Sequence, residues 1–232
     1  MSFDITFHPV AIADLERFIF DVWRVPERAN KRAREISEDP EKRRFILEAI
    51  YGPFDAWRSQ AAGGALRFDK TLGFACAAIA GYRHGYFYGG ASAISFATAA
   101  IPALALFTPL GACVAGARDL DLGDGLITEN YSASGLILPE AFDDLRRGLD
   151  LLDTQRHTIP ALFSLFEAPA RDALDSAILY AEKHGLALME VSDLVEPAEH
   201  RGSTDLDNLR VTKPQGVMTS DPEQLFPCHK EN

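Results

Sequence analysis

This chain has few cysteines and no excess of positive charge, and both features exclude certain classes of protein. Three cysteines among 232 residues are too few and too widely spaced for the disulfide framework of a small secreted domain. Asp and Glu outnumber Lys and Arg by 34 to 23, which gives a formal net charge of −11. Such a chain repels phosphate backbones and anionic membrane surfaces, so we expect no nucleic-acid and no membrane partner. A basic protein partner would be attracted to it.

The start of the chain and its cysteines indicate the cellular compartment. The first residues lack a basic stretch followed by an apolar run, so no signal peptide is predicted. Cys76 and Cys113 lie in apolar surroundings and are expected to be inert thiols of the core. Together these features predict a cytoplasmic protein.

Charge is missing altogether from residues 85–117. A run of that length could indicate a membrane span. Pro102, Pro109 and several glycines interrupt it, however, and the residues after Arg118 are acidic rather than basic. The run is therefore predicted to form the centre of a soluble core, with strands and a tightly packed helix of small residues.

Signatures of catalysis and cofactor binding are also missing. There is no glycine-rich phosphate loop, and Ser92 lacks the final glycine of a nucleophile elbow. A calcium loop fails because Asp124 and Asn130 stand at its glycine and glutamate positions. The pair Cys228-His229 has no second pair of ligands at zinc spacing. We expect no metal and no cofactor, and an enzyme with an unrecognised site, above all a hydrolase, is the alternative.

Apolar residues recur at helical or alternating spacing along the rest of the chain. The predicted elements are a strand at 3–8, helices at 11–24, 27–37 and from Asp39-Pro40 onwards, a β-hairpin region at 119–138, helices from Pro139 and at 170–184, and a strand at 186–191. Asp39 is an N-cap followed by proline at the first helical position, and Gly185 is a left-handed helix stop.

This order predicts an α+β fold with an N-terminal helical layer, a central β-sheet with a small-residue apolar core, and C-terminal helices. Residues 1–196 are predicted to form a single globular domain. Residues 197–232 are polar and punctuated by proline, which predicts an extended C-terminal arm.

Carboxylates are densest in the predicted turn and on the outer face of the helix after it. The predicted partner-binding residues are Asp119, Asp121, Asp124, Glu129, Asp143 and Asp144. Such a surface would speed the capture of a basic protein through complementary charge. The sequence therefore indicates a non-enzymatic binding protein.

Two segments carry a resemblance to a known class of proteins. Residues 129–139, ENYSASGLILP, lead into an acidic helix, and residues 177–186, AILYAEKHGL, close a later helix and begin a strand. This hairpin, helix, helix, strand arrangement covers about a third of the chain and resembles bacterial immunity proteins, which neutralise polymorphic or secreted toxins. The resemblance implies a small, acidic, cytoplasmic inhibitor without catalytic residues, and it assigns no particular functional residue.

Overall fold

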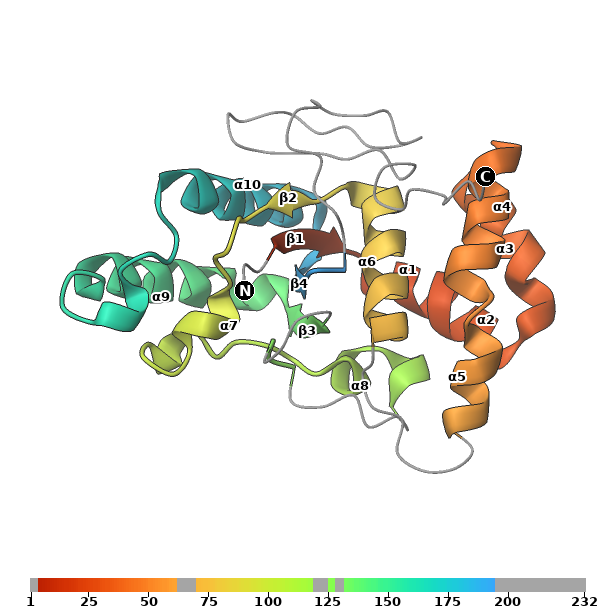
Figure 1. Ribbon diagram of the computed structural model, residues 1–232, viewed down its shortest axis with the longest axis horizontal. Helices are drawn as coiled ribbons and strands as arrows, with labels where there is room; N and C mark the ends of the chain where they lie inside the picture. The colour runs from red at the N-terminus through yellow and green to blue at the C-terminus, as the bar shows by residue number, and fades with distance from the viewer. Residues whose placement is uncertain (1–3, 62–69, 119–124, 128–131, 195–232) are drawn as a thin grey trace, which may run out of the picture.

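A four-stranded antiparallel sheet lies in the middle of the molecule, with helices on both of its faces (Figure 1). The computed structural model describes residues 4–61, 70–118, 125–127 and 132–194. The strands are β1 (Ile5–Val10), β2 (Phe87–Tyr88), β3 (Ser132–Ile137) and β4 (Ala187–Ser192), in the spatial order β2-β1-β4-β3. This arrangement confirms the predicted α+β fold.

The two inner strands, β1 and β4, are buried along their whole length. Successive side chains of a strand point to opposite faces, so each strand contributes to two cores. Phe7 and Leu188 belong to one core, whereas Val10 and Met189 belong to the other. A sheet covered on both sides has apolar residues on both faces, which explains the nearly continuous apolar sequence of β4.

The first core lies between the sheet and the N-terminal helices. Helix α6 (Lys70–His84) packs directly on β1 and β3. The helix is buried around its circumference, mostly through small side chains: Ala75, Cys76, Ala77, Ala78 and Ala80, together with the larger Leu72 and Ile79. Small residues let a helix approach a sheet closely. The helix of small residues was predicted within the charge-free run, but it lies just before that run.

The N-terminal helices form a layer on the far side of α6 (Figure 1). They are α1 (Ile12–Leu15), η1 (Glu16–Phe20), α2 (Asp21–Arg24), η2 (Pro26–Arg28), α3 (Ala29–Ile36), α4 (Pro40–Phe45), η3 (Ile46–Tyr51) and α5 (Phe54–Ala61). The predicted cap is confirmed, since the Asp39 side chain accepts a hydrogen bond from the Glu41 amide at 2.7 Å. Segments η1 and η3 have π-helical geometry, which the regular spacing of apolar residues does not reveal.

The second core lies between the other face of the sheet and the C-terminal helices. Here α7 (Ile94–Ala97), α9 (Phe142–Gln155) and α10 (Ala168–His184) cover the sheet (Figure 1). Short 3-10 turns η6 (Pro139–Ala141) and η7 (Pro160–Leu162) precede α9 and α10. The predicted stop is confirmed, because Gly185 adopts a left-handed φ of 63° and ends α10.

The charge-free run 85–117 contributes buried residues to both cores, but its predicted strands are mostly wrong. Apart from β2 it forms α7, η4 (Pro102–Leu104), α8 (Leu110–Cys113) and η5 (Ala115–Ala117). Pro102 stands at the first position of η4, where a missing N–H costs nothing. The prolines and glycines that argued against a membrane span also keep strands from extending.

The predicted hairpin at 119–138 is wrong in its pairing. Its second half forms β3, but β3 pairs with β4, and on its other side Leu136 bridges to Thr108. Residues 125–127 are not a strand, and their link to β3 is a hydrogen bond from the Gly135 amide to the Gly125 carbonyl. Turn-forming residues predict only pairing between neighbouring segments. The strand that pairs with β3 is β4, which follows both C-terminal helices in the sequence. The tip of the predicted hairpin lies outside the described residues, as does the predicted arm at 197–232.

Candidate functional site

Two of the six predicted binding residues lie in the first turn of α9. Asp143 is 84% exposed and Asp144 is also exposed. Each forms an ion pair one turn further along the helix, Asp143 with Arg146 at 3.3 Å and Asp144 with Arg147. The two arginines partly neutralise the carboxylates, so Asp143 and Asp144 contribute less negative charge to the surface than their number suggests. The other four, Asp119, Asp121, Asp124 and Glu129, lie outside the described residues.

A row of arginine bridges joins α9 to α10. Arg146 donates to both carboxylate oxygens of Glu182, at 2.8 and 2.6 Å, and this contact holds the pKa of Glu182 below its usual range. Arg171 bonds Asp153 at 2.6 Å and Asp175 at 3.0 Å. Bidentate arginine pairs fix orientation as well as charge. Arg146–Glu182 and Arg171–Asp153 therefore link the two helices on their outer side.

This outer surface is acidic, and the opposite layer is not. Residues 139–185 contain nine acidic and five basic side chains. Residues 11–61, which form the N-terminal helical layer, contain ten of each. The C-terminal layer thus carries an excess of four negative charges where the N-terminal layer carries none. Asp150 on α9 is 78% exposed, and its carboxylate lies 4.0 Å from the Arg171 guanidinium group.

The same layer carries exposed large hydrophobic side chains. In the described part of the chain, the large hydrophobic residues that are exposed are Leu151 at 45%, Phe163 at 62% and Leu179 at 61%. Leu151 lies on α9, Leu179 on α10, and Phe163 between them just after η7. Exposed apolar groups ringed by polar ones mark interaction surfaces, and aromatic residues are enriched there. The sequence did not identify these residues, because Leu151 and Leu179 fall within helices of ordinary amphipathic pattern and Phe163 lies in a turn that no local pattern marks as exposed.

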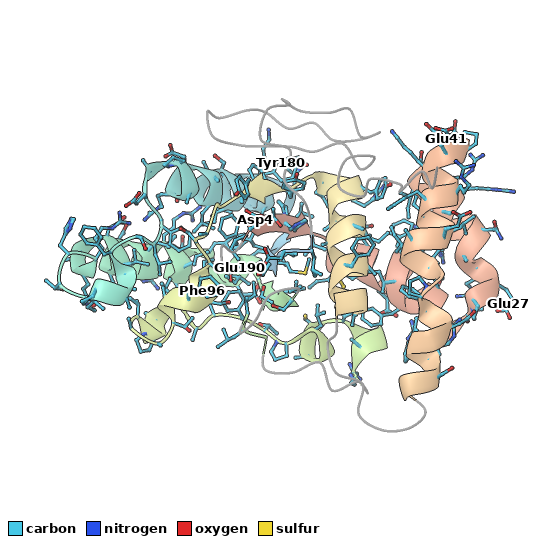
Figure 2. The ribbon with its side chains drawn as sticks, in the orientation of Figure 1. Asp4, Glu27, Glu41, Phe96, Tyr180 and Glu190 are labelled. Atoms are coloured by element: carbon cyan, nitrogen blue, oxygen red, sulfur yellow. The ribbon has the colours of Figure 1, made fainter. Side chains whose placement is uncertain are left out.

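A different kind of candidate is Glu190, a carboxylate in the middle of the molecule (Figure 2). It lies on β4 with no exposure to solvent. Its oxygens accept hydrogen bonds from the Ile94 amide, the Ser95 amide at 3.1 Å and the Ser95 hydroxyl at 2.8 Å. Burial raises the pKa of Glu190 to about 7, although these hydrogen bonds oppose the rise.

The surroundings of Glu190 indicate a structural role. The Ser95 hydroxyl also accepts from the Ile127 amide at 3.2 Å, and the Glu190 amide donates to the Ser134 hydroxyl at 2.8 Å. Glu190 thereby ties β4 to α7, to β3 and to residues 125–127. A catalytic carboxyl group must reach a substrate, and this one has no solvent-accessible surface. One signal was present in the sequence, a lone acid inside the apolar run of β4.

A second buried titratable group lies on the opposite face of the sheet. His8 of β1 has no exposure, and its Nε2 lies 2.8 Å from the Thr6 hydroxyl oxygen. Burial lowers the pKa of His8 to about 3, and the backbone of Ala77 on α6 opposes this fall only weakly. His8 is therefore a neutral hydrogen-bonding residue of the core.

The arrangement most like a catalytic one joins α1, α6 and α10. His84 Nε2 lies 3.4 Å from the Asp14 carboxylate, which Arg83 also bonds at 3.2 Å. Burial acts to raise the pKa of Asp14, but hydrogen bonds and charge from His84 and Arg83 hold it below its ordinary value. The ring of Tyr180 lies 6.5 Å from that of His84 and 4.5 Å from that of His184. A carboxylate that orients a histidine is a general-base pattern.

Cysteine chemistry is not supported at Cys76. This thiol is fully buried in α6, and burial raises its pKa well above the ordinary value. The thiol of Cys113 is only half-buried, and burial raises its pKa as well. A nucleophilic cysteine needs the opposite shift. The prediction that Cys76 is a core thiol is confirmed.

The described residues contain neither a metal-binding cluster nor a membrane-spanning helix. In these ranges no three His, Cys, Asp or Glu side chains gather so as to hold a metal ion. No helix in the same ranges is both long and apolar enough to cross a bilayer. Comparison of the chain with family models, with curated proteins and with solved structures gives no match.

Proposed function

We propose that this chain is a non-enzymatic binding protein, an immunity-type inhibitor that holds a basic toxin protein on the outer surface of α9 and α10. One observation carries the proposal. The excess of negative charge and the exposed large apolar residues of the described chain coincide on this layer, whereas the N-terminal layer is electrically balanced. Charge complementarity speeds encounter, and apolar contacts slow dissociation.

The acidic character of the surface also favours a protein partner over a nucleic acid. Polyphosphate chains bind to surfaces with a positive excess, and this layer has a negative one. An inhibitor gains from fast capture, because the toxin acts until it is bound. Complementary charge raises association rates roughly ten- to a thousandfold at low salt. Fast, salt-sensitive association is therefore the expected signature.

The test compares two double variants that change the net charge equally. Asp143→Lys with Asp150→Lys alters the α9 surface, and Glu27→Lys with Glu41→Lys alters the opposite end of the molecule (Figure 2). Two reversals of two units each move the net charge from −11 to −7 in both. Both pairs are exposed, and each includes one acid in the first turn of a helix of at least six residues, so their costs in stability should be similar.

The probe is the protein encoded by the neighbouring gene, immobilised for surface plasmon resonance. We expect the α9 variant to associate at least tenfold more slowly than wild type at about 50 mM salt, and the difference to shrink near 0.5 M as the Debye length falls. The Glu27/Glu41 variant should associate at nearly the wild-type rate. Equal slowing by both variants would contradict a binding surface on α9 and α10.

A second candidate function, a hydrolase, is favoured by one observation. The Asp14–His84 pair has the arrangement of a general base with its orienting carboxylate. Removing a general base lowers turnover by roughly a hundred- to ten-thousandfold. If the chain hydrolyses p-nitrophenyl esters and His84→Asn removes that activity while the fold persists, this second candidate replaces the first.

A further inference from the structure

The link between α9 and α10 holds an exposed aromatic side chain. Phe163 follows η7 and is 62% exposed, with its ring 6.2 Å from that of His157 in an edge-on arrangement. Its neighbours Leu162 and Leu165 belong to the core beneath α9 and α10. The chain therefore inserts residues on both sides of Phe163 into the core and leaves Phe163 outside.

Arg156 ties this link together. Its Nη2 donates to the carbonyls of Leu165 and Phe166, at 3.1 and 3.0 Å, and to the Asp153 carboxylate at 2.8 Å. The guanidinium group is mostly buried, with 17% of the side chain exposed. One fixed group thus joins the end of α9 to the end of the link. We call residues 156–167 the Phe163 corner.

The far side of the Phe163 corner is fixed to the sheet layer. The Phe166 amide donates to the Ser92 hydroxyl at 2.9 Å, and the Phe166 ring stacks on Phe7 of β1 with centroids 6.3 Å apart. Phe166 is 1% exposed. The backbone and the side chain of Phe166 are therefore both fixed by their contacts.

Phe166 adopts a conformation that a bulky residue rarely takes. Its φ is 55°, in the left-handed region that glycine and asparagine favour. Such a conformation costs on the order of 1–3 kcal/mol and persists only where the surroundings fix it, as they do here. Strain of this kind concentrates at binding and catalytic sites.

Acids and arginines lie together beside the Phe163 corner, where Asp153 pairs with both Arg156 and Arg171. Asp153 and Asp150 lie on the adjoining turns of α9, and the exposed Glu167 follows Phe166. Isolated apolar residues on a surface are ordinary. An exposed aromatic residue on a backbone fixed at both sides, with the exposed acids Asp150 and Glu167 nearby, is the arrangement expected of an interface anchor, since little backbone entropy is lost when it binds.

We infer that Phe163 is the apolar anchor of the interface and enters an apolar pocket on a basic partner protein, with the Phe163 corner holding it in its bound position before contact. This inference rests on the proposed function, because it takes the partner of the α9–α10 surface to be basic. It adds that the partner has an apolar pocket bordered by Lys or Arg side chains.

The experiment measures the affinity of the neighbouring-gene product for wild type, Phe163→Ala, Phe163→Leu and Arg156→Lys. Phe163→Ala should weaken binding about thirtyfold or more, as truncated anchor residues do. Phe163→Leu should recover most of the loss. Melting temperatures of both should match wild type, because an exposed side chain contributes little to folding.

Arg156→Lys tests whether the corner must be rigid. It keeps the charge and leaves Phe163 in place, but the lysine side chain ends one bond short of the position of Nη2, the atom that bonds both carbonyls. We expect weaker binding together with faster amide hydrogen exchange at Phe166. Unchanged affinity despite faster exchange would overturn the claim that the corner holds Phe163 ready.

The outcomes separate the inference from the function. If wild type does not bind the neighbouring-gene product, both fail. If wild type binds and Phe163→Ala binds within about twofold of it, the proposed function stands and the anchor is wrong. If wild type sediments as a dimer that Phe163→Ala dissociates, a second copy of this chain occupies the surface, and the inference of a basic partner is overturned.

Discussion

Replacing Glu190 by Gln should change how stability depends on pH. The group is fully buried, and burial raises its pKa from 4.5 to about 7. Below pH 4.5 the carboxyl group is protonated in the folded and unfolded states alike, so it contributes no pH dependence. As the pH rises from 4.5 to 7, the unfolded chain releases the proton before the folded chain does, and the folded state loses stability.

The expected size follows from the pKa. A rise of about 2.5 pH units corresponds to about 3 kcal/mol of stability lost between pH 4.5 and pH 7. Gln stays neutral throughout, but it offers one acceptor where the carboxylate offers two. The cost of the lost acceptor does not depend on pH, so it shifts the whole curve of stability against pH. The slope of the difference between wild type and variant then comes from Glu190 alone.

The assay is urea unfolding followed by tryptophan fluorescence from pH 4.5 to pH 8. The quantity is the stability of wild type minus that of Glu190→Gln, in which all other titrating groups cancel. It should fall by about 3 kcal/mol as the pH rises. Glu182→Gln is the control: Arg146 lowers the pKa of Glu182, so the stabilisation is lost only below about pH 4.5 and this difference should stay nearly flat across the assay. A flat or rising difference for Glu190 would refute the reasoning.

Three further predictions concern the core. Replacing His8 by Gln should make stability depend less on pH below pH 6.5. In wild type the unfolded chain protonates His8 below pH 6.5, whereas the folded chain keeps it neutral down to about pH 3. Wild type should therefore lose about 1.4 kcal/mol of stability per pH unit in this range through His8. Gly116→Ala should cost about 1–3 kcal/mol in urea unfolding, because a β-carbon there would lie 2.4 Å from Phe20 Cβ; an unchanged midpoint would contradict that contact. Cys76 should resist iodoacetamide in the folded protein and react once urea unfolds it, as peptide mass spectrometry would show.

The sequence predicted those structural features that depend only on residues close together in the chain. The cap at Asp39 and the stop at Gly185 depend on neighbouring residues, and both lie where the sequence indicates. The pairing of β3 depends on β4, which local turn signals do not identify. The hydrogen bond between Glu190 and Ile94 joins positions 96 residues apart, so nothing near Glu190 in the sequence names its partner.

The candidate surface was predicted in part for the same reason. Charge counting identified an acidic outer face on the helix that carries Asp143 and Asp144. It did not show that arginines already pair with these carboxylates, since a pairing of that kind is fixed by side-chain geometry. Nor did it identify Phe163, whose importance comes from the buried Arg156 and the strained Phe166 beside it.

Growth under co-expression tests the central claim, a protein inhibitor that acts through the α9–α10 surface, most directly. The neighbouring gene expressed alone should arrest growth, and wild type or the Glu27/Glu41 variant should restore it. The Asp143→Lys, Asp150→Lys variant should restore growth poorly at equal protein levels. A neighbouring-gene product that is harmless alone, or equal rescue by both charge-reversed variants, would contradict the account.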